Sequence, residues 1–179
     1  MKHIVLGITG SIAAYRGADL ARRLTKMGCS VHVILTKSAQ EFITPMTFQT
    51  LTGNRVCTDM FEKVDHPDVE HISLAKQADL VLFAPATANF IGKLANGIAD
   101  DMLTTVAMAA WKKINVICPA MNTAMYDNPI CQANLKKLRD LGYLVVEPKS
   151  ALLACGDTGR GALAGLEEII AVVNEQLEL

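Results

Sequence analysis

The sequence predicts a single α/β domain built on a doubly wound, Rossmann-like parallel sheet with helices on both faces. Five apolar runs of strand length recur along the 179 residues, and amphipathic segments of helical length lie between them. The runs are continuously apolar rather than alternating, which is typical of strands covered on both faces. A chain of this length can bury a substantial core as one unit, so we expect one domain over residues 1–179, with a flexible flap at about 150–165.

The expected strands and helices alternate along the chain. Strands are expected at 3–8, 31–36, 80–84, 114–118 and 143–147, and helices at 12–27, 88–96, 101–112, 128–141 and 166–177. In the first helix Leu20, Leu24 and Met27 share one face, Ser11 is placed to cap the start, and Gly28 ends it. Two long stretches lack such a pattern and are expected to be irregular: 53–69 and 148–165.

Composition and charge exclude several classes of protein. The chain is 51% hydrophobic and 20% charged, which excludes a disordered protein and predicts that part of the apolar surface is buried between subunits. Lysines and arginines number 17 against 18 aspartates and glutamates, without a long run of either sign. Such a chain offers no basic stripe for the phosphate backbone of a nucleic acid, so we do not expect it to bind nucleic acid. The high apolar fraction leads us to expect an oligomer.

The cysteines and the start of the chain predict a reducing, cytoplasmic environment. The five cysteines form no C-x-x-C pair and no zinc-type spacing with histidine: Cys29, Cys57, Cys118, Cys131 and Cys155. We therefore expect neither a disulfide framework nor a metal site. The apolar start is unlike a signal peptide because Gly7, Thr9, Gly10 and Ser11 interrupt it. No run approaches the length of a membrane span.

The ends of the first two strands predict an anion site. In "GITGSIAAY", 7–15, Gly10 and Ser11 join the first strand to the first helix, where exposed N–H groups and the positive helix end favour a phosphate. The stretch matches neither G-x-G-x-x-G nor the Walker pattern, so a monophosphate is the simplest ligand. Thr36 and Ser38 in "TKSA" add hydroxyl donors at the neighbouring strand end. The alternative is a pair of ordinary capped turns.

The third and fourth strands also end in polar or small residues. After the third strand, Thr87 and Asn89 are suited to a polar ring edge, while Ala86 and Ala88 let a flat aromatic system approach the backbone. The alternative is a helix cap after a proline. After the fourth strand, "PAMNTAMYDNP" at 119–129 places the amide of Asn122 between two methionines.

His71 and Cys155 are the candidate reactive residues. His71 opens "HISLAKQAD" just before the third strand, beside a glutamate, although a lone histidine is often only a cap or a surface residue. Cys155 lies in the glycine-rich "LLACGDTGRGALAG", the composition of a lid over a substrate. The alternative is a flexible surface loop that holds a thiol.

"GSIAAY", His71, "PATAN", "PAMNTAMY" and "ACGDTG" occur here in one order. Over nearly the whole chain this resembles the homo-oligomeric flavin-dependent cysteine decarboxylase family, most specifically in "PAMNTAMY" and "ACGD". The resemblance implies that FMN is the cofactor. Its phosphate and ribityl chain would be held by Gly10, Ser11, Ile12, Thr36 and Ser38, and its ring bordered by Thr87, Ala88, Asn89 and Ala120.

The resemblance also implies roles on the substrate side. His71 would be the catalytic histidine, Asn122 would grip the substrate, Met125 would shape the apolar surround, and Cys155 would donate a proton from the flap. The substrate phosphate needs a cation, and Lys76, on the same stretch as His71, is the candidate. One departure concerns Arg160: many relatives read "GxGRM" after the flap cysteine, whereas this chain reads "GRGAL", so no role is assigned to this arginine.

The most similar branch of the family decarboxylates phosphopantothenoylcysteine to phosphopantetheine in coenzyme A biosynthesis. By this resemblance FMN takes a hydride, a thioaldehyde forms, carbon dioxide leaves, and the enethiol is reduced again with a proton from Cys155. The resemblance further implies a trimer, or an assembly of trimers, with flavin sites between subunits, and a separate synthetase that supplies the substrate.

Three alternatives stay open. A peptidyl-cysteine decarboxylase would stop at the enethiol, and relatives of that kind lack the thiol that Cys155 provides. A flavin prenyltransferase would use FMN as a substrate, against which "PAMNTAMY" and "ACGD" argue. A non-catalytic flavin-binding regulatory subunit would not need the intact set of His71, Asn122 and Cys155.

Overall fold

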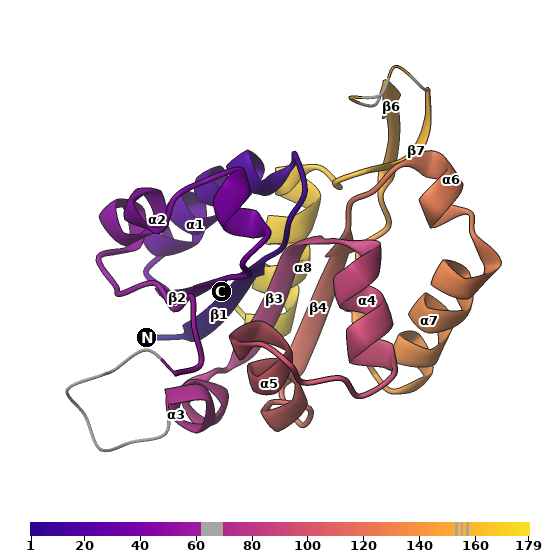
Figure 1. Cartoon of the computed structure of the whole chain (residues 1–179). Coiled ribbons are helices and arrows are strands. Elements are labelled where there is room, and N and C mark those ends of the chain that lie inside the picture. The colour runs from indigo at the N-terminus through magenta and orange to yellow at the C-terminus, as the bar shows by residue number, and fades with distance from the viewer. Residues whose placement is uncertain (62–69, 153, 155, 157) are drawn as a thin grey trace.

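The computed structural model describes residues 1–61, 70–152, 154, 156 and 158–179. Its centre is a five-stranded parallel sheet in the order β2-β1-β3-β4-β5 (Figure 1). The strands are β1 His3–Ile8, β2 Ser30–Leu35, β3 Leu80–Ala86, β4 Ile114–Pro119 and β5 Leu144–Val145. The predicted doubly wound α/β fold is therefore confirmed.

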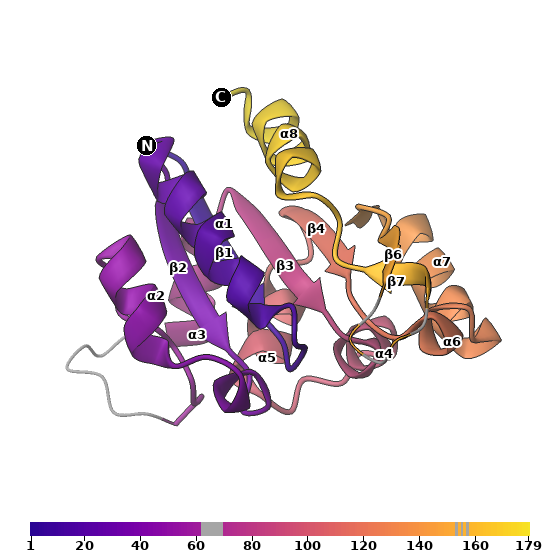
Figure 2. The same cartoon turned by 90° about the horizontal axis from the view of Figure 1, so that it is seen from above.

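Helices cover both faces of the sheet (Figure 2). One face carries α1 Ala14–Lys26, α2 Pro45–Thr52 and α8 Leu166–Leu177, and the other carries α3 Glu70–Gln77, α4 Ala88–Ala95, α5 Met102–Ala109 and α7 Pro129–Asp140. Successive strand residues point to opposite faces, so Ile4 and Leu6 pack beneath α1 and α8 while Val5 packs with α3 and α5. Two cores result, one on each side of the sheet.

Gly7 shows how closely the second core is packed. A Cβ at Gly7 would lie 2.4 Å from Cδ1 of Leu103 on α5. The glycine therefore lets α5 lie against the carboxyl half of β1. This close packing seats α5 directly against the sheet.

Most predicted elements are confirmed to within about three residues. The first helix begins at Ala14, and Ser11 is not its N-cap: that position is Ala13, whose N–H donates to Ser11 Oγ at 3.2 Å. Ser11 instead shapes the preceding turn, where its own N–H donates to Thr9 O at 2.9 Å. Gly28 follows the helix as expected, with a φ of 86°.

Several elements differ from the prediction, among them helix α2 Pro45–Thr52, which no expected element covers. The 148–165 stretch is not irregular throughout, because it holds an antiparallel hairpin of β6 Lys149–Leu152 and β7 Thr158–Ala162. The last strand of the sheet, expected at 143–147, has only two residues. Short helical segments also appear at η1 Ala39–Glu41 and α6 Thr123–Tyr126. Within the described residues, no helix has the length and apolar character needed to cross a bilayer.

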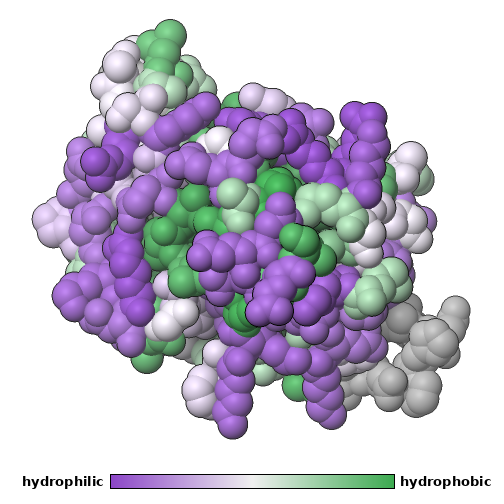
Figure 3. Space-filling model, turned by 180° about the vertical axis from the view of Figure 1, so that it is seen from behind, coloured by the Kyte–Doolittle hydropathy of each residue, from purple (hydrophilic) through white to green (hydrophobic). Residues whose placement is uncertain are grey.

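The hairpin stands away from the body of the molecule at the edge near α6 (Figure 1). Seen from behind, the molecule is largely covered by hydrophilic side chains, with hydrophobic ones gathered in the middle of this face and on the projecting end (Figure 3). The base of the hairpin lies beside the carboxyl ends of the strands, where the candidate site is found.

Candidate functional site

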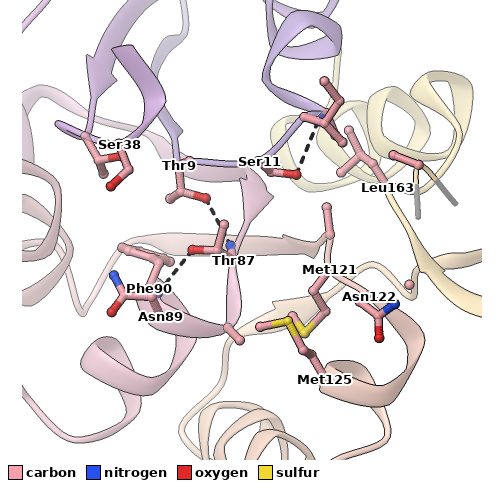
Figure 4. Close-up of a pocket in the computed structure, with 18 of the residues that line it drawn as sticks. Thr9, Ser11, Ser38, Thr87, Asn89, Phe90, Met121, Asn122, Met125 and Leu163 are labelled. Atoms are coloured by element: carbon pink, nitrogen blue, oxygen red, sulfur yellow. Dashed lines mark hydrogen bonds between the residues drawn. The ribbon is translucent and has the colours of Figure 1, made fainter. Parts of the chain in front are cut away.

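A pocket of about 880 Å³ lies at the carboxyl ends of the strands (Figure 4). This volume is in the range of small-molecule and cofactor sites. The pocket is lined by the segments that leave four strands and by the base of the hairpin: 9–13, 36–38, 87–90, 120–122 and 161–163, with further residues that include Met125. In a sheet of this strand order the crevice between β1 and β3 is the expected ligand site, because the direction of winding reverses there.

Thr9 ties the ends of β1 and β3 together. Its side chain is 2% exposed, and its Oγ1 donates to the carbonyl oxygen of Pro85 at 2.7 Å and accepts from the N–H of Thr87 at 3.0 Å. Both bonds bridge segments that are far apart in sequence. They hold two walls of the pocket at a set separation (Figure 4).

The turn after β1 meets the turn after β2 at Gly10. A Cβ at this position would lie 2.5 Å from Cβ of Ser38 and 3.1 Å from its carbonyl oxygen. Only glycine lets the two turns approach so closely. Gly10, Ser11, Ile12, Thr36 and Ser38 consequently line one end of the pocket, beside the start of the 13-residue helix α1. The positive end of the helix dipole favours an anion there.

Three cations also line the pocket, and the sequence reasoning did not identify them. Arg16 lies on the first turn of α1, Lys37 in the turn after β2, and Lys93 on α4. Lys93 donates to both carboxylate oxygens of Asp100 at 2.9 Å, which lowers the pKa of that carboxyl below its usual value. Arg16 is the third residue of α1, which begins shortly after the turn at Gly10 and Ser11. This closeness in the sequence was the signal that could have pointed to Arg16.

The ring end of the predicted cofactor site is built from small residues. Thr87 caps α4 by accepting from the N–H of Phe90 at 3.4 Å, and Ala88 and Asn89 follow it along the pocket wall. Ala120 is buried, and its N–H donates to the carbonyl oxygen of Ala86 at 3.0 Å. Because these side chains are short, a flat ring system can approach the backbone of β3 and β4.

Asn122 is the N-cap of α6. Its Oδ1 accepts from the N–H of Ala124 at 2.8 Å. The cap directs the amide oxygen towards the helix and the amide nitrogen the opposite way. Met121 and Met125 line the pocket beside Asn122 and supply an apolar surround (Figure 4).

Tyr126, at the end of α6, anchors this segment to the chain that leads into β6. Its ring is 2% exposed, and its hydroxyl donates to Glu147 at 2.5 Å, while Arg139 also donates to Glu147. Burial and the bond to Glu147 raise the pKa of Tyr126 above its ordinary value. Gln132 donates to the carbonyl oxygen of Tyr126 at 2.6 Å. The helix that carries Asn122 is thus held at its far end.

The pocket unites all nine predicted cofactor residues with Asn122 and Met125. His71 is not among the lining residues: it lies partly buried in the first turn of α3. Lys76 is exposed on the same helix and also outside the pocket lining, and its carbonyl oxygen accepts from Lys113 Nζ at 2.8 Å. Cys155 lies outside the described residues.

The described cysteines are buried packing residues. Burial raises the pKa of Cys29, Cys118 and Cys131, which disfavours their thiolate forms. Cys57 is also buried, and its thiol donates to Glu70 at 3.1 Å. Across the described part of the chain, no three His, Cys, Asp or Glu side chains form a group that could hold a metal ion.

The chain is similar to proteins of known name over nearly its whole length. Residues 1–178 match the flavoprotein family. A "Probable phosphopantothenoylcysteine decarboxylase" of Streptococcus mutans is 49% identical over 177 residues, which cover 98% of this chain and 99% of the relative. The "Coenzyme A biosynthesis bifunctional protein CoaBC" of Bacillus subtilis is 44% identical over 174 residues, and the match spans 97% of this chain but 43% of that protein.

Solved structures agree with these relatives. A mutant PPC decarboxylase complexed with pantothenoylaminoethenethiol has a TM-score of 0.87 and 31% identity, with 99% of each chain covered. The FMN-dependent cysteine decarboxylase SpaF has a TM-score of 0.86 and 30% identity, with 100% of this chain and 98% of that chain covered.

Proposed function

The chain belongs to the flavoprotein family, and we propose that it is an FMN-dependent carboxy-lyase that converts phosphopantothenoylcysteine to phosphopantetheine in coenzyme A biosynthesis. The observation that carries the proposal is the pocket, which places the hydroxyl-rich turns of three strand ends beside the Asn122 turn. The full-length similarity to the streptococcal relative supports the choice of substrate.

The residues of the pocket fit FMN. The close approach of Gly10 to Ser38, the start of α1 and the guanidinium of Arg16 form an end that favours the phosphate anion of FMN. Ala88 and Ala120 form a flat wall at the other end. When bound, FMN supplies a hydride acceptor for the carbon that bears sulfur and later returns the hydride. The buried walls around it exclude water from the reacting carbon.

Asn122 is assigned to the substrate carboxylate. With its oxygen held by Ala124 N–H, the amide is oriented to donate from its nitrogen. An uncharged donor places the carboxylate without stabilising its charge so strongly that loss of carbon dioxide is slowed. Met121 and Met125 supply the apolar surround for the departing carbon dioxide.

His71 and Lys76 are assigned to the pocket of a neighbouring copy in a homotrimer, because neither lies in the pocket lining of its own chain. An imidazole can accept a proton and suits a base at the thiol of the substrate. The ammonium group of Lys76 suits the substrate phosphate. Ile12 and Tyr15 at the pocket are each 61% exposed, which supports an association that covers them.

Cys155 is assigned as the proton donor that completes the saturated thiol. Ala154, the residue before it, lines the pocket, which supports this assignment. We further propose that residues 1–179 act as one domain in which 150–165 form the flap, that the protein is cytoplasmic, and that a synthetase outside these residues supplies the substrate.

Mass spectrometry of the reaction product tests the function. The purified flavoprotein is incubated with phosphopantothenoylcysteine, and the expected product is the substrate less carbon dioxide, with no further loss of hydrogen. A peptide that ends in cysteine is the control and should stay unchanged. An unchanged phosphopantothenoylcysteine in a protein that holds FMN would overturn the proposal, and a product that lacks two hydrogens would favour the peptidyl type of reaction.

A further inference from the structure

Two glycines of β7 lie directly on the turn that carries Asn122. The N–H of Met121 donates to the carbonyl oxygen of Gly161 at 2.9 Å. A Cβ at Gly161 would lie 2.2 Å from the carbonyl oxygen of Met121, and a Cβ at Gly159 would lie 2.5 Å from Oγ1 of Thr123. The hairpin and the turn therefore approach at two successive points that only glycine permits.

Neither contact can be relieved by a small side-chain rotation. The atom that faces Gly161 belongs to the main chain of Met121, and Gly161 has a φ of 151°, which L side chains rarely adopt. Gly159 faces the branched side chain of Thr123, with Cγ2 at 2.8 Å and Cβ at 3.1 Å from the added carbon. A methyl group at either glycine requires β7 and the turn to separate by about 1 Å to reach ordinary contact.

The contact joins two parts of the same pocket wall. Gly161, Ala162 and Leu163 line the pocket on the hairpin side, and Met121 and Asn122 line it on the α6 side. The bond from Met121 to Gly161 is made by the residue immediately before Asn122. A displacement of β7 is therefore passed to the Asn122 backbone.

We propose that Gly159 and Gly161 are positioning residues: by seating β7 on residues 121–123, they set where the Asn122 amide lies in the pocket. This inference rests on the proposed function, in which Asn122 meets the substrate carboxylate. A displacement of about 1 Å at a group that orients a substrate can cost about a hundredfold in rate. The effect is expected on the substrate side and not at the FMN end, because Gly10 and Ser38 lie on other strand ends.

Complementary truncation tests the inference. Gly159→Ala, Thr123→Ala and the double variant are purified with FMN, and phosphopantothenoylserine, in which a hydroxyl replaces the thiol, is titrated by its effect on the flavin absorbance. Gly159→Ala should weaken binding of this analogue, and lower kcat/KM for phosphopantothenoylcysteine, by about tenfold to a hundredfold with full flavin content. In the double variant both quantities should return to within about twofold of those of Thr123→Ala, because the two clashing atoms are gone.

Gly161→Ala is a second test variant, and Gly142→Ala is its matched control. Gly142 also has a positive φ, 92°, but a Cβ there meets nothing within 4 Å, so its substitution introduces backbone strain without a clash. Gly142→Ala should lower Tm and leave analogue binding unchanged, whereas Gly161→Ala should impair binding.

The outcomes separate the inference from the proposed function. An active wild type whose Gly159→Ala and Gly161→Ala variants bind and react normally would overturn the inference alone. A flavin-loaded wild type that neither binds the analogue nor decarboxylates the substrate would overturn the proposed function, and the inference with it. If Gly159→Ala does not fold, the double variant decides: normal binding supports the inference, and impaired binding in a folded protein contradicts it.

Discussion

The hydroxyl of Thr9, at the end of β1, bonds to two backbone groups at the end of β3: it accepts from the N–H of Thr87 at 3.0 Å and donates to the carbonyl oxygen of Pro85 at 2.7 Å. Since Thr9 is almost fully buried, water cannot replace these bonds. The polar bridge therefore holds the β1 and β3 ends, between which the cofactor is proposed to lie.

Thr9→Val should lower the free energy of unfolding by about 2 kcal/mol, because it preserves shape but leaves the Thr87 N–H without its acceptor. Urea unfolding measures this change, and flavin content reports the effect on the pocket. The control is Thr50→Val, whose hydroxyl bonds only within its own exposed helical turn, to Met46. Equal losses in the two variants would show that the buried bridge has no special weight.

Asn122→Asp should separate the cap of α6 from the donor to the substrate. A carboxylate can still accept from the N–H of Ala124, so Tm and flavin content should stay close to those of wild type. The amide donor is lost and a negative charge faces the substrate carboxylate, so kcat/KM should fall by about a hundredfold or more. Asn122→Ala should lose both cap and activity. Normal turnover by Asn122→Asp would remove this residue from substrate binding.

Glu70 fixes the start of α3, the helix that carries His71. Its carboxylate accepts from Arg55 at 2.9 Å and from the buried thiol of Cys57 at 3.1 Å, and Cys57 is itself bridged to Ile34 of β2. Glu70→Ala should reduce the rate of carbon dioxide release about tenfold while the protein keeps its flavin.

The matched control for Glu70 is Glu167→Ala, which removes an exposed ion pair with Arg23. An exposed pair contributes little to stability, so this variant should react like wild type. A Glu70→Ala protein with wild-type kcat would show that the anchor does not serve His71.

His32 should make stability depend on pH. Burial, and secondarily the nearby His3, lower the pKa of His32 below 6.5. Because the pKa of His32 is lower in the folded state, the unfolded state binds the proton more readily. The contribution of His32 to the free energy of unfolding is therefore fully present above pH 6.5 and is lost as the pH falls through the pKa of the folded state. His32→Gln should therefore flatten the fall in stability between about pH 7 and pH 5, measured by urea unfolding at each pH. An unchanged slope would contradict this assignment.

Several elements could be predicted because their causes are local. Continuous apolar runs, such as those at 3–8 and 80–84, are typical of strands that are covered on both faces, as β1 and β3 are. The turn at Gly10 and Ser11 and the cap residues Thr87 and Asn122 follow strands directly, and the carboxyl ends of parallel strands meet at one edge. Their gathering at one edge of the sheet could therefore be predicted from the sequence.

Other features depend on contacts between distant segments. The β6–β7 hairpin was not predicted because the segment around Gly159 and Gly161 lacks the alternation of apolar and polar residues that is typical of a strand. The positions of these glycines depend on their contacts with Thr123 and Met121. The nearness of Arg16 to the Gly10 turn in the sequence suggests its place, but its presence in the pocket lining also depends on how α1 is rotated on the sheet, which the local sequence does not specify.

By itself the sequence determined the doubly wound α/β fold and the residues at the strand ends, because burial pattern and turn chemistry are read from neighbours in the chain. Only the tertiary structure decided which of these residues share one pocket. Helix α3 packs with α5 in the core beneath the other face of the sheet, so His71 and Lys76 lie outside the pocket of their own chain. Packing between distant segments sets these positions, and no spacing along the chain encodes them.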